Sequence, residues 1–158
     1  MLRIFLKVNM QFMNIRPPIT VTELFSGAGL MSEGFRRHGF RTVFAAEMDP
    51  RAVRSYNRNL EPVAQVWDAT KVRNDLRSRI IVAGPPCQGF SSLGKRQAHD
   101  ERNKLSLCVA DWAIANGTDV IVIENVPQFL NSDYWARIRG RMRRLGYKST
   151  EWILDAAD

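Results

Sequence analysis

Cysteine is scarce in this chain, and long apolar runs are missing from it. Only Cys87 and Cys108 occur among 158 residues. Two isolated cysteines fit neither a metal-site spacing nor the density of a disulfide scaffold, so we expect free thiols in a reducing compartment and no metal site. No run reaches the roughly 20 apolar residues of a membrane-spanning helix. Lys7 interrupts the apolar N-terminal stretch, which also lacks a signal-peptide cleavage site. The sequence therefore predicts a cytoplasmic protein without a membrane partner.

Acidic residues are fewer than basic residues in this chain. Lysine and arginine outnumber aspartate and glutamate by 23 to 16, which gives a net charge of +7. Such a surface favours a polyanionic partner, of which nucleic acid is the simplest. Much of the excess lies between Asp133 and Glu151, a stretch without any acid. Apolar residues recur there at helical spacing, which predicts a helix with solvated arginines on one face and these residues in the core: Trp135, Ile138, Met142 and Leu145.

The chain has no internal repeat, low-complexity tract or interdomain linker, which favours a single domain. We divide it into an N-terminal extension, residues 1–18, without an assigned element, and one domain over residues 19–158. Strand-like runs occur at residues 20–25, 42–47, 79–84 and 119–124, with weaker runs at 64–67 and 150–154. Helical patterns fill most of the gaps. This alternation predicts an α/β fold with a doubly wound, mainly parallel sheet.

Two of the expected helices have clear ends in the sequence. Asp49 followed by Pro50 is typical of an N-cap and a first helical position. Gly117 is typical of a residue just past a helix end. In the helix before Gly117, Cys108 shares a face with Trp112, so Cys108 is predicted to be a core residue without chemistry.

Three strands end in residues that suit ligand contact, and doubly wound sheets bind ligands at the carboxyl ends of their strands. The first strand runs into Phe25-Ser26-Gly27-Ala28-Gly29, whose glycines allow a tight turn and a close backbone approach. Glu47 ends the second strand, 20 residues after Gly27. A carboxylate in that place accepts hydrogen bonds from ribose hydroxyls. Asp68 follows the third strand and could receive an adenine amino group. Together these residues predict a nucleoside cofactor.

Two cofactors fit such a site. Dinucleotide sites typically use G-x-G-x-x-G, but the third glycine position, counted from Gly27, is Ser32 here. S-adenosylmethionine has a ribose and an adenine but no pyrophosphate. Its sulfonium would also be attracted by an aromatic face such as that of Phe25. We therefore predict S-adenosylmethionine, with NAD as the alternative.

A thiol stands at the end of a fourth strand, where Cys87 follows Pro85-Pro86. A single cysteine is most often a small buried residue of the core. Here, however, the next strand brings a carboxyl group, that of Glu124, to the same edge of the sheet. A thiolate that adds to C6 of a pyrimidine makes C5 electron-rich enough to take a methyl group, and an acid that protonates N3 spreads the charge. Cysteine suits this task because it is both a strong nucleophile and a good leaving group. Burial at the strand end would help Glu124 to hold its proton.

These segments together resemble the N-terminal, catalytic half of DNA (cytosine-5) methyltransferases, as found in restriction–modification systems. The similar segments keep the family order and read ELFSGAGLMSEGF, AAEMDPRAVRSYNRN, WDAT, GPPCQGFSSLGKR and IENVP. The pairing of P-P-C-Q with E-N-V is highly specific, whereas the glycine loop alone is not. The resemblance implies a Rossmann-like, S-adenosylmethionine-dependent methyltransferase domain over residues 19–158 that is incomplete at its C-terminal strands.

The resemblance also implies roles for individual residues. Cys87 would be the nucleophile, and Glu124 would donate a proton to a cytosine flipped out of the DNA duplex. The other assignments belong to the cofactor pocket, and they are Phe25, Gly27, Gly29, Glu47, Met48, Asp68, Pro86 and Leu105.

The sequence also departs from the family pattern. Family members continue after the sixth strand with a Gln-x-Arg-x-Arg segment, a target-recognition domain and a return that completes the sheet, and none of these precedes Asp158. We therefore expect an unpaired sheet edge, low activity of this chain alone, and a second polypeptide that supplies the recognition domain. A fragment, a decayed gene and half of a split enzyme all fit this pattern. The alternative functions are an RNA cytosine-5 methyltransferase and an inactive module that binds the cofactor or a partner.

Overall fold

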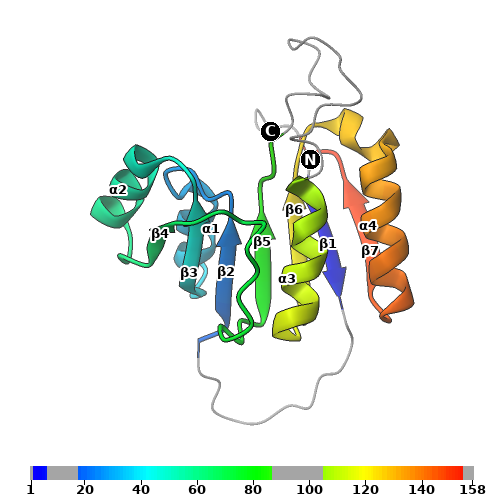
Figure 1. The fold of residues 1–158 in the computed structure, drawn as a ribbon, viewed down its shortest axis with the longest axis horizontal. Helices are drawn as coiled ribbons and strands as arrows, with labels where there is room; N and C mark the ends of the chain where they lie inside the picture. Colours follow the sequence, from blue (N-terminus) through cyan, green and yellow to red (C-terminus); the bar gives the residue numbers. More distant parts are fainter. Residues whose placement is uncertain (1, 7–17, 87–104, 155–158) are drawn as a thin grey trace.

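The computed structural model describes residues 2–6, 18–86 and 105–154, which form one seven-stranded sheet with helices on its faces (Figure 1). The strand order is β4-β3-β2-β5-β6-β1-β7. The strands are β1 (Leu2–Leu6), β2 (Thr20–Leu24), β3 (Arg41–Glu47), β4 (Ala64–Val66), β5 (Ile80–Ala83), β6 (Val120–Glu124) and β7 (Lys148–Trp152). The neighbouring pairs from β4 to β6 are all parallel. The predicted α/β fold with a mainly parallel sheet is thus confirmed.

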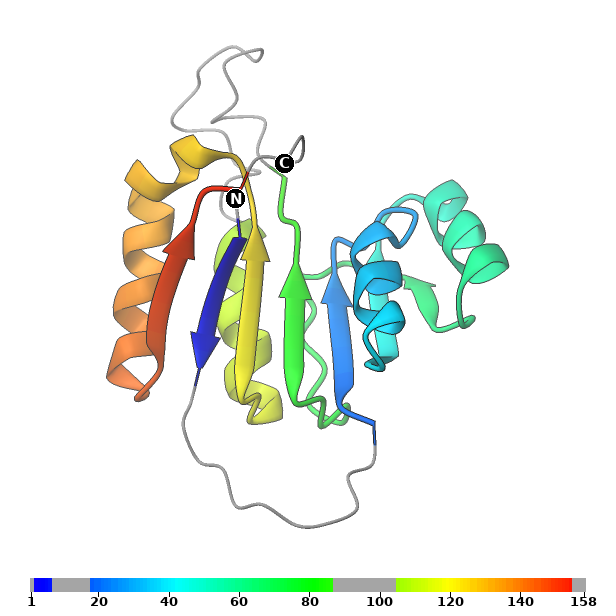
Figure 2. The same ribbon diagram turned by 180° about the vertical axis from the view of Figure 1, so that it is seen from behind.

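Helices cover the sheet from both sides, as two opposite views show (Figures 1 and 2). Helices α3 (Cys108–Asn116) and α4 (Asp133–Arg144) lie on one face, and α1 (Leu30–Arg37) lies on the other. Helix α2 (Pro50–Asn59) packs beside β4, and a short 3-10 helix, η2 (Pro127–Asn131), leads into α4. In the middle of the sheet, all four residues of β5 are buried. This is the burial expected for a parallel strand that has helices on both sides.

The predicted helix ends are present in the structure. Asp49 caps α2, because its Oδ1 accepts a hydrogen bond from the backbone N–H of Arg51 at 2.8 Å, and Pro50 is the first helical residue. Gly117 ends α3 in the left-handed conformation, with a φ of 60°. These local signals therefore fix where the chain enters α2 and where it leaves α3.

The main core lies between the sheet and the pair α3 and α4. Trp112 of α3 is fully buried and stacks on Phe44 of β3 with a centroid distance of 5.8 Å. Cys108 is buried in the same cluster, as predicted. Trp135, Ile138 and Met142 of α4 are buried as well, but the prediction for Leu145 was wrong, since its side chain is 42% exposed. Leu145 is the C-cap residue of α4, where the helical periodicity no longer applies.

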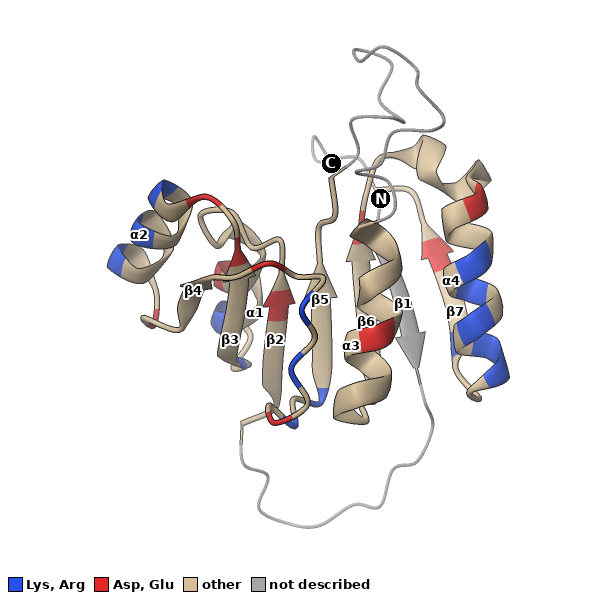
Figure 3. Ribbon diagram, viewed as in Figure 1, with Lys and Arg blue, Asp and Glu red and all other residues tan. Residues whose placement is uncertain are grey.

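The arginines of α4 lie on its outer side, where Figure 3 shows a row of basic residues. Arg137, Arg139, Arg143 and Arg144 are exposed. Arg141 reaches across to α3 and pairs with Asp111 at 2.6 Å. Exposed ion pairs contribute little to stability. The solvated face predicted for this helix is what the structure shows.

An N-terminal strand occupies a place for which the sequence analysis predicted no element. Strand β1 lies between β6 and β7 and is antiparallel to both, so that Ile4 faces Val122 on one side and Thr150 on the other. The sixth predicted strand, at residues 150–154, corresponds to β7, which is the edge strand of the sheet in the described part of the chain. Residues 2–6 supply a partner for its inner side from within the chain, a strand that the sequence analysis did not predict. Among the described residues, no helix is long and apolar enough to cross a membrane.

Candidate cofactor and catalytic site

The register of the sheet brings the predicted site residues to one edge. Leu24 of β2 pairs with Ala46 of β3 and with Ala83 of β5, and Ala83 pairs with Ile123 of β6. These four residues form one row across the sheet. The next residue of each strand lies just beyond that row at the carboxyl edge, and these residues are Phe25, Glu47, Gly84 and Glu124.

The glycine loop after β2 has an unusual backbone. Phe25, Gly27 and Gly29 have φ angles of 59°, 53° and 93°. Inside the loop, the N–H of Gly29 donates to the carbonyl of Ser26 at 2.9 Å. The N–H of Ser26 in turn donates to the carbonyl of Ala46 at 3.1 Å and holds the loop to β3. A left-handed Phe is costly, and such conformations are concentrated at ligand sites.

Glu47 is bound to this loop directly. Its Oε2 accepts a hydrogen bond from the N–H of Gly27 at 2.8 Å, and its Oε1 accepts one from the N–H of Asp49 at 2.8 Å. Each carboxylate oxygen has a second lone pair, so Glu47 retains capacity to accept hydrogen bonds from hydroxyl groups. Glu47 therefore lies directly beside the glycine loop, and its predicted role toward ribose hydroxyls stays a prediction.

The loop has room and an unused polar group for a ligand. A Cβ built on Gly27 would meet no atom within 4 Å. Within the described part of the chain, the Ser26 hydroxyl is buried and has no hydrogen-bond partner. Met48, the residue after Glu47, has a side chain that is 62% exposed. An open backbone, an unpaired hydroxyl and an apolar side chain at one strand end are features of a small-molecule site.

Asp68 lies on the chain that continues from β4. The N–H of Trp67 donates to the carbonyl of Glu47 at 2.9 Å, which keeps this segment beside the end of β3. Hydrogen bonds from the backbone N–H and the hydroxyl of Thr70 hold the pKa of Asp68 below its usual value. Asp68 is therefore an ionised acceptor at neutral pH, oriented by Thr70.

Glu124 and the segment that precedes Cys87 lie together. A Cβ built on Gly84 would stand 3.8 Å from Glu124 Oε2. The amide of Asn125 donates to the carbonyl of Pro85 at 3.1 Å, and both residues are buried. Glu124 itself is exposed. Its expected burial at the strand end is therefore wrong, because the carboxyl lies at the open edge of the sheet.

Three further residues were predicted for the site, and they are Cys87, Pro86 and Leu105. Cys87 lies outside the described residues, while Pro86 just before it is partly buried. Leu105 opens a 3-10 turn before α3 and is partly buried.

Burial raises the pKa of the Cys108 thiol to about 12, so this thiol is not a nucleophile at neutral pH. No group of three or more potential metal ligands gathers in the described ranges. Asn125 lies in the IENVP segment, but its contact with Pro85 was not predicted from the sequence.

A doubly wound sheet with a glycine loop after its first parallel strand and an acidic residue at the end of the next is typical of a nucleoside-binding domain of the Rossmann-like class. The family comparison is more specific. Residues 19–158 match the model of the C-5 cytosine-specific DNA methylases. This chain belongs to that family, as the sequence motifs predicted. S-adenosylmethionine is the methyl donor of the family, which confirms the predicted class of cofactor.

Individual relatives support the same assignment. The chain is 31% identical to the type II methyltransferase M.AgeI of Thalassovita gelatinovora, and the match covers 86% of this chain and 35% of the relative. It is 34% identical to the type II methyltransferase M1.HphI of Haemophilus parahaemolyticus, with 89% and 42% covered. Among solved structures, S. pombe Dnmt2 methyltransferase aligns with a TM-score of 0.67 and 26% identity over 82% of this chain and 43% of that one. The chain thus spans less than half the length of these relatives.

Proposed function

We propose that this chain provides the catalytic part of an enzyme that transfers a methyl group from S-adenosylmethionine to C5 of cytosine in DNA. The row Phe25, Glu47, Gly84 and Glu124 carries this proposal, because it brings the glycine loop and the Glu124 carboxyl to the same edge of the sheet. Membership of the cytosine-5 methylase family supports the reaction. The cytoplasmic location remains a prediction.

The described residues fit the cofactor. Glu47 would accept hydrogen bonds from the ribose hydroxyls, and Asp68 would accept one from the adenine amino group. Phe25 and Met48 would provide apolar and aromatic surface, and the buried Ser26 hydroxyl would gain the partner that it lacks among the described residues. Gly27, Gly29, Pro86 and Leu105 complete the predicted pocket. When bound, S-adenosylmethionine supplies an electrophilic methyl group on a sulfonium centre.

The chain's own groups activate the base. The Cys87 thiolate adds to C6 of the cytosine ring, the π electron pair of the C5–C6 bond shifts to C4–C5, and the π electron pair of the C4–N3 bond moves onto N3. Glu124 provides a proton at N3, which neutralises the charge that the addition creates. Once a base has removed the proton from C5 of the methylated ring, the C6–S bond breaks, Cys87 leaves as the thiolate, and N3 returns its proton to Glu124. The contact between Asn125 and Pro85 supports this assignment, since it ties the strand end that carries Glu124 to the segment that leads into Cys87.

The positive net charge of the chain and its membership of the DNA methylase family favour DNA as the substrate. A net charge of +7 attracts a polyanion but cannot select one base. Base flipping costs a few kcal/mol, which contacts from a recognition domain usually offset. We propose that activity requires a second polypeptide, or further residues, equivalent to the part of the relatives that these 158 residues do not match.

Transfer of a tritiated methyl group tests this function. We expect near-background transfer by the 158-residue chain and clear transfer to DNA after addition of the C-terminal part of a close relative. DNA that contains 5-fluorocytosine should then become covalently attached, because fluorine cannot leave C5 as a proton does. Cys87→Ser should abolish the adduct, and Cys108→Ala should retain it. Transfer to RNA alone would favour the RNA methyltransferase, and an adduct that survives Cys87→Ser would contradict the role of this thiol.

A further inference from the structure

A buried polar cluster flanks the glycine loop and has no part in the site described above. Its members, which we name the anchoring cluster, are Glu23 of β2, Ser32 of α1, Thr42 of β3 and Tyr56 of α2. Their exposed fractions are 2%, 2%, 8% and 1%. Glu23 precedes the loop by two residues, and Ser32 follows it by three. The cluster therefore joins both ends of the loop to the two elements that surround Glu47.

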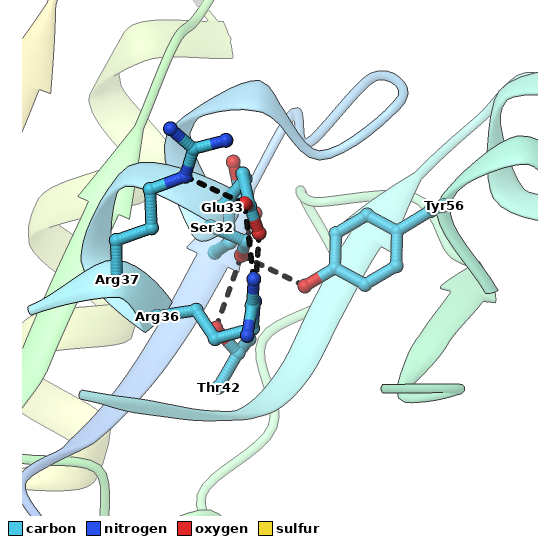
Figure 4. Close-up of polar contacts among 7 residues, drawn as sticks. Ser32, Glu33, Arg36, Arg37, Thr42 and Tyr56 are labelled. Atoms are coloured by element: carbon cyan, nitrogen blue, oxygen red, sulfur yellow. Dashed lines mark hydrogen bonds and ion pairs between the residues drawn. The ribbon is translucent and has the colours of Figure 1, made fainter. Parts of the chain in front are cut away.

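Ser32 is the centre of the cluster, as Figure 4 shows for Thr42 and Tyr56. Its hydroxyl donates to Glu23 Oε2 and accepts from the Tyr56 hydroxyl at 2.7 Å. Thr42 Oγ1 lies 3.0 Å from the same oxygen. A serine hydroxyl has one proton and two lone pairs. Because the proton goes to Glu23, Thr42 must be a donor, and the hydrogen-bonding capacity of Ser32 is then filled.

Tyr56 contacts the loop in a second way. A Cβ built on Gly29 would lie 2.7 Å and 2.9 Å from two carbons of the Tyr56 ring, so the ring packs directly on this glycine. Burial raises the pKa of Tyr56, which keeps its hydroxyl protonated as a donor. One side chain of α2 therefore covers the last residue of the loop and also holds the first turn of α1.

The middle of the loop depends on its ends. The N–H of Gly27 donates to Glu47 Oε2 from within a turn in which Phe25, Gly27 and Gly29 are left-handed. That conformation is intrinsically unfavourable for Phe25 and must be imposed by the surroundings. The anchoring cluster adds side-chain contacts on both sides of the turn to the pairing of β2 in the sheet and to the hydrogen bond from Ser26 to Ala46.

The chemistry of the cluster also indicates a role beyond packing. A carboxyl group costs free energy when it is buried, and burial raises the pKa of Glu23 to about 7. An apolar residue at this position of β2 would avoid that cost. The directional hydrogen bonds of a carboxyl and three hydroxyls instead specify a single arrangement of four elements.

We propose that the anchoring cluster holds the loop Phe25–Gly29 in the conformation that cofactor binding requires, with Ser32 and Tyr56 as positioning residues. This inference rests on the proposed function for its effect on the cofactor. Its effect on the loop itself does not depend on that function.

Amide hydrogen exchange tests the effect on the loop. In Tyr56→Phe, which keeps the ring on Gly29 but removes the hydroxyl, the amides of Gly27 and Gly29 should exchange about tenfold faster. Ser32→Ala should have a larger effect, since it removes every hydrogen bond at the centre of the cluster. Ser55→Ala, on the neighbouring residue of α2, is the matched control and should change neither amide. The amides of Ile121 and Ile123 in β6 report whether the fold itself has loosened. Unchanged exchange at Gly27 and Gly29 in both cluster variants would overturn the proposal.

Titration with S-adenosylhomocysteine by calorimetry tests the effect on the cofactor site. Tyr56→Phe should weaken binding about three- to tenfold relative to the wild-type chain and the Ser55→Ala control, as expected for loss of one hydrogen bond. Equal affinity in all three would overturn the positioning role. If the wild-type chain binds no S-adenosylhomocysteine at all, the proposed cofactor is wrong, and the exchange data alone decide whether the cluster anchors the loop.

Discussion

The side-chain amide of Asn125 donates a hydrogen bond to the carbonyl of Pro85 at 3.1 Å, across the boundary between β6 and β5. The other end of that amide, Oδ1, accepts from the N–H of Val126 at 2.9 Å. One buried residue therefore orders the turn after Glu124 and also holds the segment before Cys87. The two motifs that carry the proposed chemistry form one connected unit.

Asn125→Ala should separate these two segments. It leaves the buried Pro85 carbonyl without a partner and should lower the free energy of unfolding by about 1–3 kcal/mol. Urea denaturation measures this change. Asn59→Ala is the control, because Asn59 also donates to a carbonyl, that of Ser55 at 2.8 Å, but is exposed. Equal stability losses in the two variants would show that the link to Pro85 has no special importance.

Glu23 should make the stability of the chain depend on pH. Its pKa is raised to about 7 by burial, with the negative charge of Glu47 as a smaller contribution in the same direction. Below the unfolded pKa the carboxyl is protonated in both states. Between the two values only the folded state keeps the proton, so the free energy of unfolding falls as pH rises, by up to about 3 kcal/mol.

Replacing Glu23 by Gln should remove this slope. Thermal or urea unfolding at several pH values between 5 and 8 measures it for both proteins. The wild-type chain should lose stability relative to Glu23→Gln as pH rises through about 7. Parallel pH profiles for the two proteins would contradict the assignment, since Tyr56 remains protonated in this range and cannot replace the titration of Glu23.

Gly29→Ala should damage the loop more than an ordinary left-handed glycine substitution does. The new Cβ would lie 2.5 Å from Leu60 Cδ1 and 2.7 Å from the Tyr56 ring, at a φ of 93°. Backbone strain and overpacking together should cost about 2–4 kcal/mol. Gly39→Ala separates the two effects, because Gly39 has a φ of 80° with no atom within 4 Å of the added carbon. Its cost should stay near 1 kcal/mol, and equal costs for both variants would show that the ring contact is unimportant.

The sequence predicted those features that depend on local signals and on strand order. Asp49 with Pro50 marked the start of α2, and Glu47 ends the second strand beside the glycine loop, at the edge of the sheet where the sequence placed both. These predictions succeed because capping is local and because parallel strands must end at a common edge.

Other features depend on tertiary contacts that no short segment reveals. Strand β1 pairs with β6 and β7, which are more than a hundred residues away in sequence, so no local pattern located it. Ser32 was recognised only as a departure from a glycine motif, whereas its partners come from three other elements. The unexpected exposure of Glu124 likewise follows from the shape of the sheet edge.

The most direct test of the central claim is calorimetric titration of the purified chain with S-adenosylmethionine, S-adenosylhomocysteine and NAD. We predict binding of the first two and not of NAD, with a loss of about 1.5–3 kcal/mol in Glu47→Ala, the worth of a hydrogen bond to a charged group. The exposed Glu61→Ala should bind as the wild type does. Tight binding of NAD without any response to S-adenosylmethionine would contradict the account.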